Sequence, residues 1–303
     1  MNRFNQSGFP KARRRVNMRS ALFLLMIAFG VLLLRGSIQM MLPGMGQGLS
    51  VALSMLASVA GFGVPAYMGL CLVDGDQRRI VPVHALSRSH ILHLTLLGVL
   101  FVCPASLAAD MLTAVFSRMG FGSAAGSAAP GMGLFLPMLL GSVLLAPVCE
   151  ELFFRGYLTQ ALRPYSQRGA LVLPALAFAV MHGMDAALLP RFALGCLLTM
   201  MMNRTGSVVA PMLVHAAYNF TLLVLAFSGL EGFVTGPGLI ACVLRILGCA
   251  AFAGVLRRAY ADRMQRKTAD FGVDAPLGRR ELALLIGAGA ALLAAMIVSG
   301  VTA

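Results

Sequence analysis

The sequence predicts an all-α fold, a polytopic bundle of eight or nine transmembrane helices whose N-terminus lies in the cytoplasm. Apolar residues make up 59% of the 303 residues, charged residues only 12%, and the mean hydropathy is +0.84, all outside the range of soluble domains. Runs of about 18 or more mostly apolar residues recur along the chain, each long enough to cross a ~30 Å hydrocarbon core. Because lipid cannot satisfy an open backbone, every such span must be helical.

We expect nine spans. Their approximate ranges are 20–42, 49–73, 91–116, 132–158, 169–188, 192–203, 207–229, 237–256 and 282–301. The sixth is short, and eight spans remain if it is a half-helix. The basic stretch before the first span resembles a signal peptide. However, the apolar run continues past Arg35 to Leu42 without a small-x-small cleavage site, so it predicts a retained anchor.

Basic residues gather on alternate connections between the spans. With the N-terminus inside, the inner segments contain Arg13, Arg14, Arg15, Arg78, Arg79, Arg163, Arg168, Arg204, Arg257, Arg258, Arg266, Lys267, Arg279 and Arg280, among others. The outer connections carry only Arg118 and Arg191. This asymmetry is the positive-inside pattern of a multi-pass protein of the cell membrane. It explains the net charge of +13, so nucleic-acid binding is not indicated.

Polar patterns within the spans divide the chain into three parts. We expect an N-terminal anchor with peripheral helices over residues 1–131, a catalytic transmembrane core over 132–230, and C-terminal helices with a basic cytoplasmic loop over 231–303. The six cysteines are scattered through apolar segments and form no C-x-x-C pair. Neither a disulfide framework nor a thiolate metal site is therefore predicted.

The first polar pattern, in the fourth span, is Glu150-Glu151-x-x-x-Arg155. The two glutamates are consecutive, so their side chains diverge by ~100° on a helix. Glu151 and Arg155 are four residues apart and share a face, where they can form an ion pair. Glu150 is left without a cation on its own helix, which suits a general base. The alternative is a purely structural ion pair beside a snorkelling glutamate.

Two further patterns follow in the next spans, Phe178-x-x-x-His182 and His215-x-x-x-Asn219. His182 and Glu150 lie at similar depths in antiparallel neighbouring spans, so we expect them to meet. His215 and Asn219 share a helical face and can donate hydrogen bonds to one oxygen, as an oxyanion hole does. Hydrogen-bonded packing between helices is the alternative for these residues. Ionisable groups at membrane depth are rarely kept without a use.

The three patterns, in this order on consecutive spans, resemble the CAAX-processing and bacteriocin-processing (CPBP, also called Abi) family of intramembrane proteases. The resemblance covers about residues 132–230 and implies hydrolysis of a peptide bond inside the membrane. It implies that Glu151 and Arg155 fix the helix and orient the catalytic base.

The same resemblance assigns the remaining roles. Glu150 is implied as the base that activates water, and His182 as a group that helps to hold this water. His215 and Asn219 are implied as the pair that stabilises the oxyanion. Family members are commonly labelled metalloproteases, so a divalent metal such as zinc is an open alternative, with Glu150, His182 and His215 as its ligands. Against it, a metal that used Glu150 as a ligand would remove the most suitable base.

The sequence therefore predicts an intramembrane endopeptidase that cuts a membrane-associated substrate, C-terminally lipidated proteins being one class. Two alternatives stay open. One is a noncatalytic immunity or scaffolding member of the same fold. The other is a transporter or proton relay, since such proteins also bury Glu, His and Arg, although these polar groups cluster in one patch. The partners expected are the bilayer and a membrane-embedded or lipidated peptide.

Overall fold

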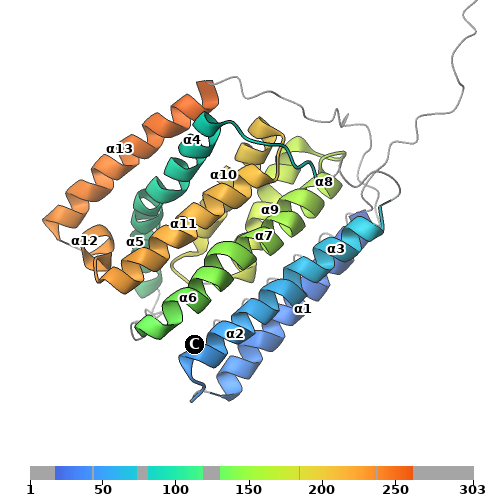
Figure 1. Ribbon diagram of the computed structural model, residues 1–303, viewed down its shortest axis with the longest axis horizontal. Helices are drawn as coiled ribbons and strands as arrows, with labels where there is room; N and C mark the ends of the chain where they lie inside the picture. Colours follow the sequence, from blue (N-terminus) through green and yellow to red (C-terminus); the bar gives the residue numbers. More distant parts are fainter. Residues whose placement is uncertain are drawn as a thin grey trace, which may run out of the picture.

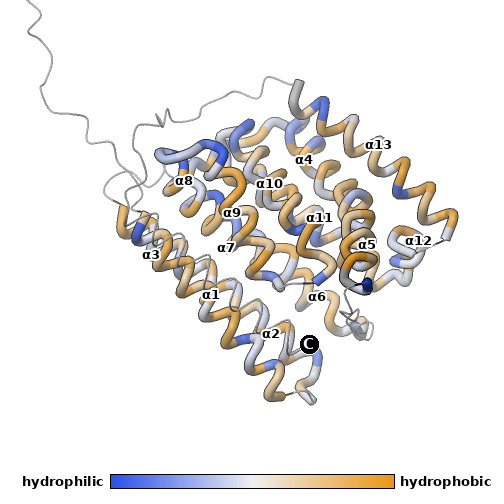
Figure 2. The backbone as a smooth tube through the Cα atoms, turned by 180° about the vertical axis from the view of Figure 1, so that it is seen from behind, coloured by the Kyte–Doolittle hydropathy of each residue, from blue (hydrophilic) through white to orange (hydrophobic). Residues whose placement is uncertain are grey.

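The structure is a computed structural model that describes residues 18–42, 44–73, 81–118, 130–183, 185–236 and 238–261. Within these ranges it contains helices and connecting turns but no strand. The helices form a bundle in which the first and the last described helices lie at opposite edges (Figures 1 and 2). The expected all-helical architecture is confirmed. The predicted span 282–301 lies outside the described residues.

Six helical segments are long and apolar enough to cross a membrane: Met18–Met41, Gln47–Cys71, Arg88–Val115, Met132–Leu162, Val209–Ser228 and Leu239–Ala259. Five of them are formed, wholly or for the most part, by α1 (Met18–Met41), α2 (Gln47–Ser58), η1 (Val59–Gly63), α3 (Val64–Cys71), α4 (Arg88–Leu100), α5 (Val102–Arg118), α11 (Val209–Ser228) and α13 (Leu239–Ala261). The segment Met132–Leu162 consists of η3 (Met132–Leu134), α6 (Phe135–Met138), η4 (Leu139–Leu145), α7 (Ala146–Glu151), η5 (Leu152–Leu158) and α8 (Thr159–Leu162). The short helix α12 (Glu231–Thr235) precedes α13.

Two expected spans differ from the six. Helix α9 (Gln167–Met181) has 15 residues, which at 1.5 Å per residue reach only about 22 Å. Helix α10 (Leu188–Thr205) has 18 residues, but charged Arg191 and Arg204 and polar Asn203 lower its hydropathy. The two helices pack closely against each other. The structure thus keeps both predicted helices while showing that they do not have the length or composition of full spans.

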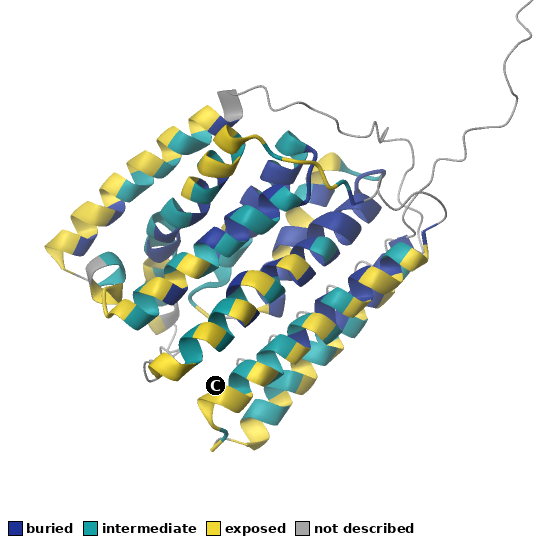
Figure 3. Cartoon of the chain, viewed as in Figure 1, coloured by how far each residue is buried: buried dark blue, intermediate teal, exposed yellow. Residues whose placement is uncertain are grey.

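Buried residues concentrate around α8, α9 and the adjoining half of α10, whereas α13 is mostly exposed (Figure 3). One apolar cluster joins α1 and α3 to the segment α7–α8 and to α9, with Phe153, Phe154 and Phe178 at its centre. A second joins α4, α10, α11 and α13. The polar patterns lie where these two clusters meet.

Small residues set the closest helix contacts. A Cβ atom added to Gly98 on α4 would lie 2.3 Å from the carbonyl oxygen of Val214 on α11. On α10, a Cβ atom at Gly195 would lie 2.8 Å from the Cα atom of Ala175 on α9. Close backbone approach through glycine is a common way in which transmembrane helices associate.

Replacing Gly98 by alanine should destabilise the bundle, because the added methyl group meets backbone and α4 must move away from α11. We expect a cost of about 1–3 kcal/mol, measured as a lower thermal midpoint in detergent. Gly254→Ala on α13 is the matched control, since its Cβ would meet nothing within 4 Å. Equal midpoints for the two variants would contradict the proposed packing.

Candidate active site

The segment that carries both glutamates is a helix interrupted by two wide, π-helical stretches. η4 precedes α7 and η5 follows it, so the hydrogen-bond ladder changes on both sides of Glu150 and Glu151. Pro147 near the start of α7 has no N–H to donate to the preceding turn, which helps to explain the irregularity there. The carbonyl of Arg155 inside η5 accepts a hydrogen bond from the side chain of Gln160, 3.2 Å away. Wide turns of this kind are frequent at functional sites.

Glu151 and Arg155 form a fully buried ion pair. Nη1 of Arg155 donates to Oε1 of Glu151 at 2.9 Å, and both side chains are 0% exposed. The same Oε1 atom lies 2.9 Å from Nδ1 of His215 on α11. One carboxylate oxygen therefore holds a guanidinium on its own helix and an imidazole on another. Glu151 fixes the geometry of both.

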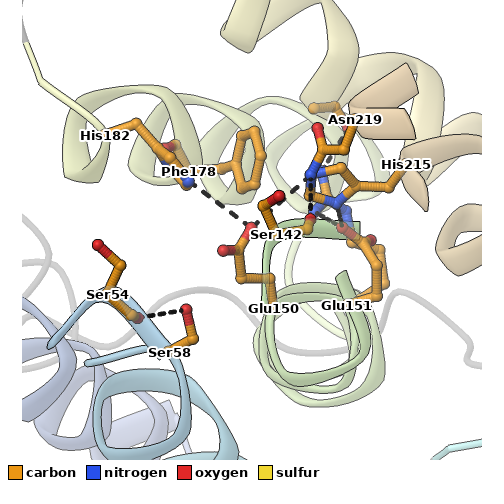
Figure 4. A network of polar contacts seen from close by, with 11 residues as sticks. Ser54, Ser58, Ser142, Glu150, Glu151, Phe178, His182, His215 and Asn219 are labelled. Atoms are coloured by element: carbon orange, nitrogen blue, oxygen red, sulfur yellow. Dashed lines mark hydrogen bonds and ion pairs between the residues drawn. The ribbon is translucent and has the colours of Figure 1, made fainter. Parts of the chain in front are cut away.

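Glu150 points to the other side, as its position in the sequence predicts, and lies between two imidazoles (Figure 4). Its Oε2 atom is 3.7 Å from Nε2 of His182 and 3.9 Å from Nε2 of His215. The Glu150 side chain is 6% exposed and His182 31% exposed. Oε2 has no hydrogen-bond partner within the described residues. Both distances exceed a direct hydrogen bond, and polar atoms at this separation are commonly bridged by water.

The hydrogen bonds on the far side of each ring fix where the imidazole protons are. Nδ1 of His182 lies 2.7 Å from the carbonyl oxygen of Phe178, and a carbonyl can only accept, so this nitrogen carries a proton. Nδ1 of His215 likewise donates to the carboxylate of Glu151, which is paired with Arg155. In the neutral rings both Nε2 atoms are then acceptors. With both rings neutral, three acceptor atoms face one small space, which suits a water molecule that donates its protons.

Asn219 and Phe178 complete the arrangement. Nδ2 of Asn219 donates to the carbonyl oxygen of Ser142 in η4 at 2.8 Å, so its amide is tied to the helix that carries the glutamates. The ring of Phe178 lies 4.6 Å from that of His182 and 5.6 Å from that of His215, measured between centroids. The Arg155 guanidinium carbon stands 5.0 Å from the same ring. Phe178 therefore packs between both imidazoles and the arginine.

The six residues predicted from the three patterns are brought together in the structure. A seventh contribution comes from α10, which no pattern singled out. Nη2 of Arg155 donates to the carbonyl oxygen of Gly195 at 2.9 Å, and the Thr199 hydroxyl donates to the same oxygen at 3.1 Å. This contact uses a backbone atom, so it cannot be predicted from the types of the side chains. The one signal in the sequence is a glycine within an apolar helix.

The residue types at this site are suitable ligands for zinc, but the distances between their ligand atoms fit zinc less well. Two imidazoles and a carboxylate are zinc ligands, and each ring donates its other N–H to an oxygen, as ligating histidines do. With bonds of 2.0–2.1 Å, tetrahedral ligand atoms stand about 3.3 Å apart, whereas the two distances that meet at Oε2 are 3.7 and 3.9 Å. Among the described residues, no group of three His, Cys, Asp or Glu side chains has the geometry to hold a metal ion.

Comparison with known proteins bears on this segment of the chain. The family described as "Type II CAAX prenyl endopeptidase Rce1-like" matches residues 132–221, which contain all three patterns. Searches of curated proteins and of solved structures found no match. The resemblance predicted from the three patterns is thereby confirmed: residues 132–221 match the family of Rce1-like CAAX endopeptidases.

Proposed function

We propose that this protein is an intramembrane endopeptidase in which Glu150 activates a water molecule for attack on a peptide bond. The observation that carries the proposal is the convergence of Oε2 of Glu150 and Nε2 of His182 and of His215 on one small space. A buried carboxylate with no bonded partner on Oε2 has a free acceptor for a water proton. The match of residues 132–221 to a family of endopeptidases supports the same reaction.

The proposed chemistry needs one water and no covalent enzyme intermediate. Glu150 takes a proton from the water while the water oxygen bonds to the carbonyl carbon of the substrate. The carbonyl becomes a tetrahedral oxyanion, and Glu150 then passes its proton to the leaving nitrogen as the C–N bond breaks. His182, on the exposed side of Glu150, holds the water against the carboxylate.

His215 and Asn219 are the proposed donors to the oxyanion. Because Nδ1 of His215 is committed to Glu151, this ring can donate through Nε2 only when it carries both protons. Asn219 has a second amide proton besides the one bonded to Ser142. Glu151 and Arg155 hold the arrangement in place.

The orientation and the substrate belong to the same proposal. We propose that the protein lies in the cell membrane and crosses it eight or nine times. Its N-terminus then lies in the cytoplasm. The sequence puts Arg88 at the start of α4, Arg163 just after α8, Arg168 at the start of α9 and Arg258 in the last turn of α13. These helix ends gather at one end of the bundle (Figure 2), which supports a positive-inside orientation. The substrate is a membrane-embedded or lipidated peptide that enters from the bilayer.

Comparing the membrane peptides of cells that express the wild-type protein with those of cells that express Glu150→Gln tests this function. We expect one or more membrane peptides to be shortened only in the presence of the wild-type protein. Identical peptide sets would contradict the protease proposal. Solute uptake by proteoliposomes of the wild-type protein that is lost with Glu150→Gln would support a transporter instead. Cells that express Glu150→Gln and have the same phenotype as wild-type cells would support a scaffolding protein.

Removal of divalent metal should leave the activity intact. We expect purified protein dialysed against a strong chelator to cleave at the rate of untreated protein, because the proposed base acts directly on water. Total metal content should be measured on the same sample to verify the removal. Loss of activity that returns with added zinc would contradict the proposed mechanism and assign Glu150, His182 and His215 as ligands.

A further inference from the structure

His182 stands at the C-terminal end of α9, which holds its ring through the hydrogen bond from Nδ1 to the Phe178 carbonyl oxygen. Helix α9 ends at Met181, and His182 is the first residue after it. The next residue, Gly183, has φ +112°, a conformation that L side chains rarely adopt. The chain therefore turns sharply beside the imidazole that faces Glu150. Contacts that hold this turn therefore bear on how the end of α9 presents the imidazole to Glu150.

Asp185 and Arg191 hold the turn at Gly183. Nη1 and Nη2 of Arg191 donate to the two carboxylate oxygens of Asp185 at 2.8 and 3.0 Å. Oδ1 of Asp185 also accepts a hydrogen bond of 2.8 Å from the backbone N–H of Ala187, the residue just before α10. Nη1 of Arg191 lies 3.4 Å from the carbonyl oxygen of Gly183. Bidentate arginine–carboxylate pairs are the ion pairs that fix geometry best.

The same face of α10 also holds the buried part of the site. Arg191, Gly195 and Thr199 are spaced four residues apart and share one stripe of the helix. The first contacts the turn after His182, and the second accepts a hydrogen bond from Arg155. One helix face thus contacts the supports of both the water-holding imidazole and the Glu151–Arg155 pair.

We propose that Arg191, acting through Asp185 and Gly183, is a positioning residue that fixes the His182 imidazole against the Glu150 carboxylate. The proposal rests on the proposed function, because it gives His182 a reacting partner to be aligned with. A displacement of about 1 Å in such a group can cost up to about 100-fold in rate. The two parallel hydrogen bonds of the planar Arg191 guanidinium fix the geometry, so a positive charge alone at this position does not suffice.

The variants Asp185→Asn and Arg191→Lys test the proposal. Asn keeps an oxygen for the Ala187 N–H but loses the charged fork, and Lys keeps the charge but not the two parallel bonds. We expect each to lower kcat about 10-fold or more while KM and the thermal midpoint change little. The double variant should be no slower than the slower single variant, since both remove one contact.

The ion pair between Asp110 on α5 and Arg245 on α13 provides the matched control, because it too joins a partly exposed Asp to a less exposed Arg. Asp110→Asn and Arg245→Lys should leave kcat unchanged. A readout independent of activity is the ¹⁵N NMR signal of the His182 ring, in protein labelled at its five histidines. It should shift in Asp185→Asn and Arg191→Lys and stay in place in the controls.

The outcomes separate the two proposals. If Glu150→Gln is inactive while Asp185→Asn and Arg191→Lys keep the wild-type kcat and the wild-type His182 signal, the positioning role is overturned and the protease function stands. If Glu150→Gln cleaves like the wild type, the proposed function itself fails. Equal losses of kcat in the control variants would also overturn the positioning role, because they would show a general effect of ion pairs on the bundle.

Discussion

Glu150→Gln is expected to fold like the wild type and to cleave no membrane peptide. The substitution keeps the size of the side chain and removes only its ability to act as a base. Glu150 forms no ion pair within hydrogen-bond distance, so its loss leaves no buried charge without a partner. General-base removal alone costs about 10²–10⁴-fold in rate. The measurement is cleavage of a membrane-spanning peptide by purified protein in proteoliposomes, with the thermal midpoint as the control for folding.

An active Glu150→Gln protein would remove the base assignment. A variant with a much lower thermal midpoint would instead show that Glu150 supports the fold, contrary to its unpaired Oε2 atom. The comparison must use protein purified to a single species, because trace wild-type enzyme could mimic slow cleavage.

Glu151→Gln, one residue away, should behave differently and lose stability as well as activity. Its carboxylate is the partner of Arg155 and of His215, at 2.9 Å from each. Neutralising it leaves the Arg155 guanidinium, which is 0% exposed, without a counter-charge. Removing one partner of a buried pair typically costs about 3–5 kcal/mol. We therefore expect a marked drop in the thermal midpoint, together with loss of cleavage because His215 is no longer oriented.

The two glutamine variants are controls for each other, since they change adjacent residues in the same way. Equal thermal midpoints would contradict the division of labour between a catalytic Glu150 and a supporting Glu151. Arg155→Gln should reproduce the instability of Glu151→Gln, because it leaves the Glu151 carboxylate buried without its cation.

The sequence carries the parts of this site that depend on helical spacing. Residues four apart share a face, so Glu151 could be paired with Arg155 and Glu150 left to point elsewhere, which is what the structure has. The similar depth of His182 and Glu150 in neighbouring spans predicted that the two side chains face each other. The approximate ends of the eight described long helices follow from apolar run length and from the charges and prolines between runs.

Other features depend on atoms and contacts that residue types do not reveal. The proton positions on His182 and His215 follow from the Phe178 carbonyl and the Glu151 carboxylate behind each ring. The Gly195 carbonyl that holds Arg155 is a backbone atom. Helix α9 ends at Met181 because the chain turns at Gly183, whereas its apolar pattern continues to residue 188. Such contacts become visible only when the helices are packed.

In the proposed mechanism the hydrolytic water lies between residue 150 and the substrate. A structure of the Glu150→Gln variant with an uncleaved substrate peptide tests it most directly. The expected result is a single ordered water within hydrogen-bond distance of the residue 150 side chain and of Nε2 of His182. The scissile carbonyl carbon should lie about 3–3.5 Å beyond that water, with its oxygen towards His215 and Asn219. A peptide bound away from this group, or a metal ion in place of the water, would contradict the account.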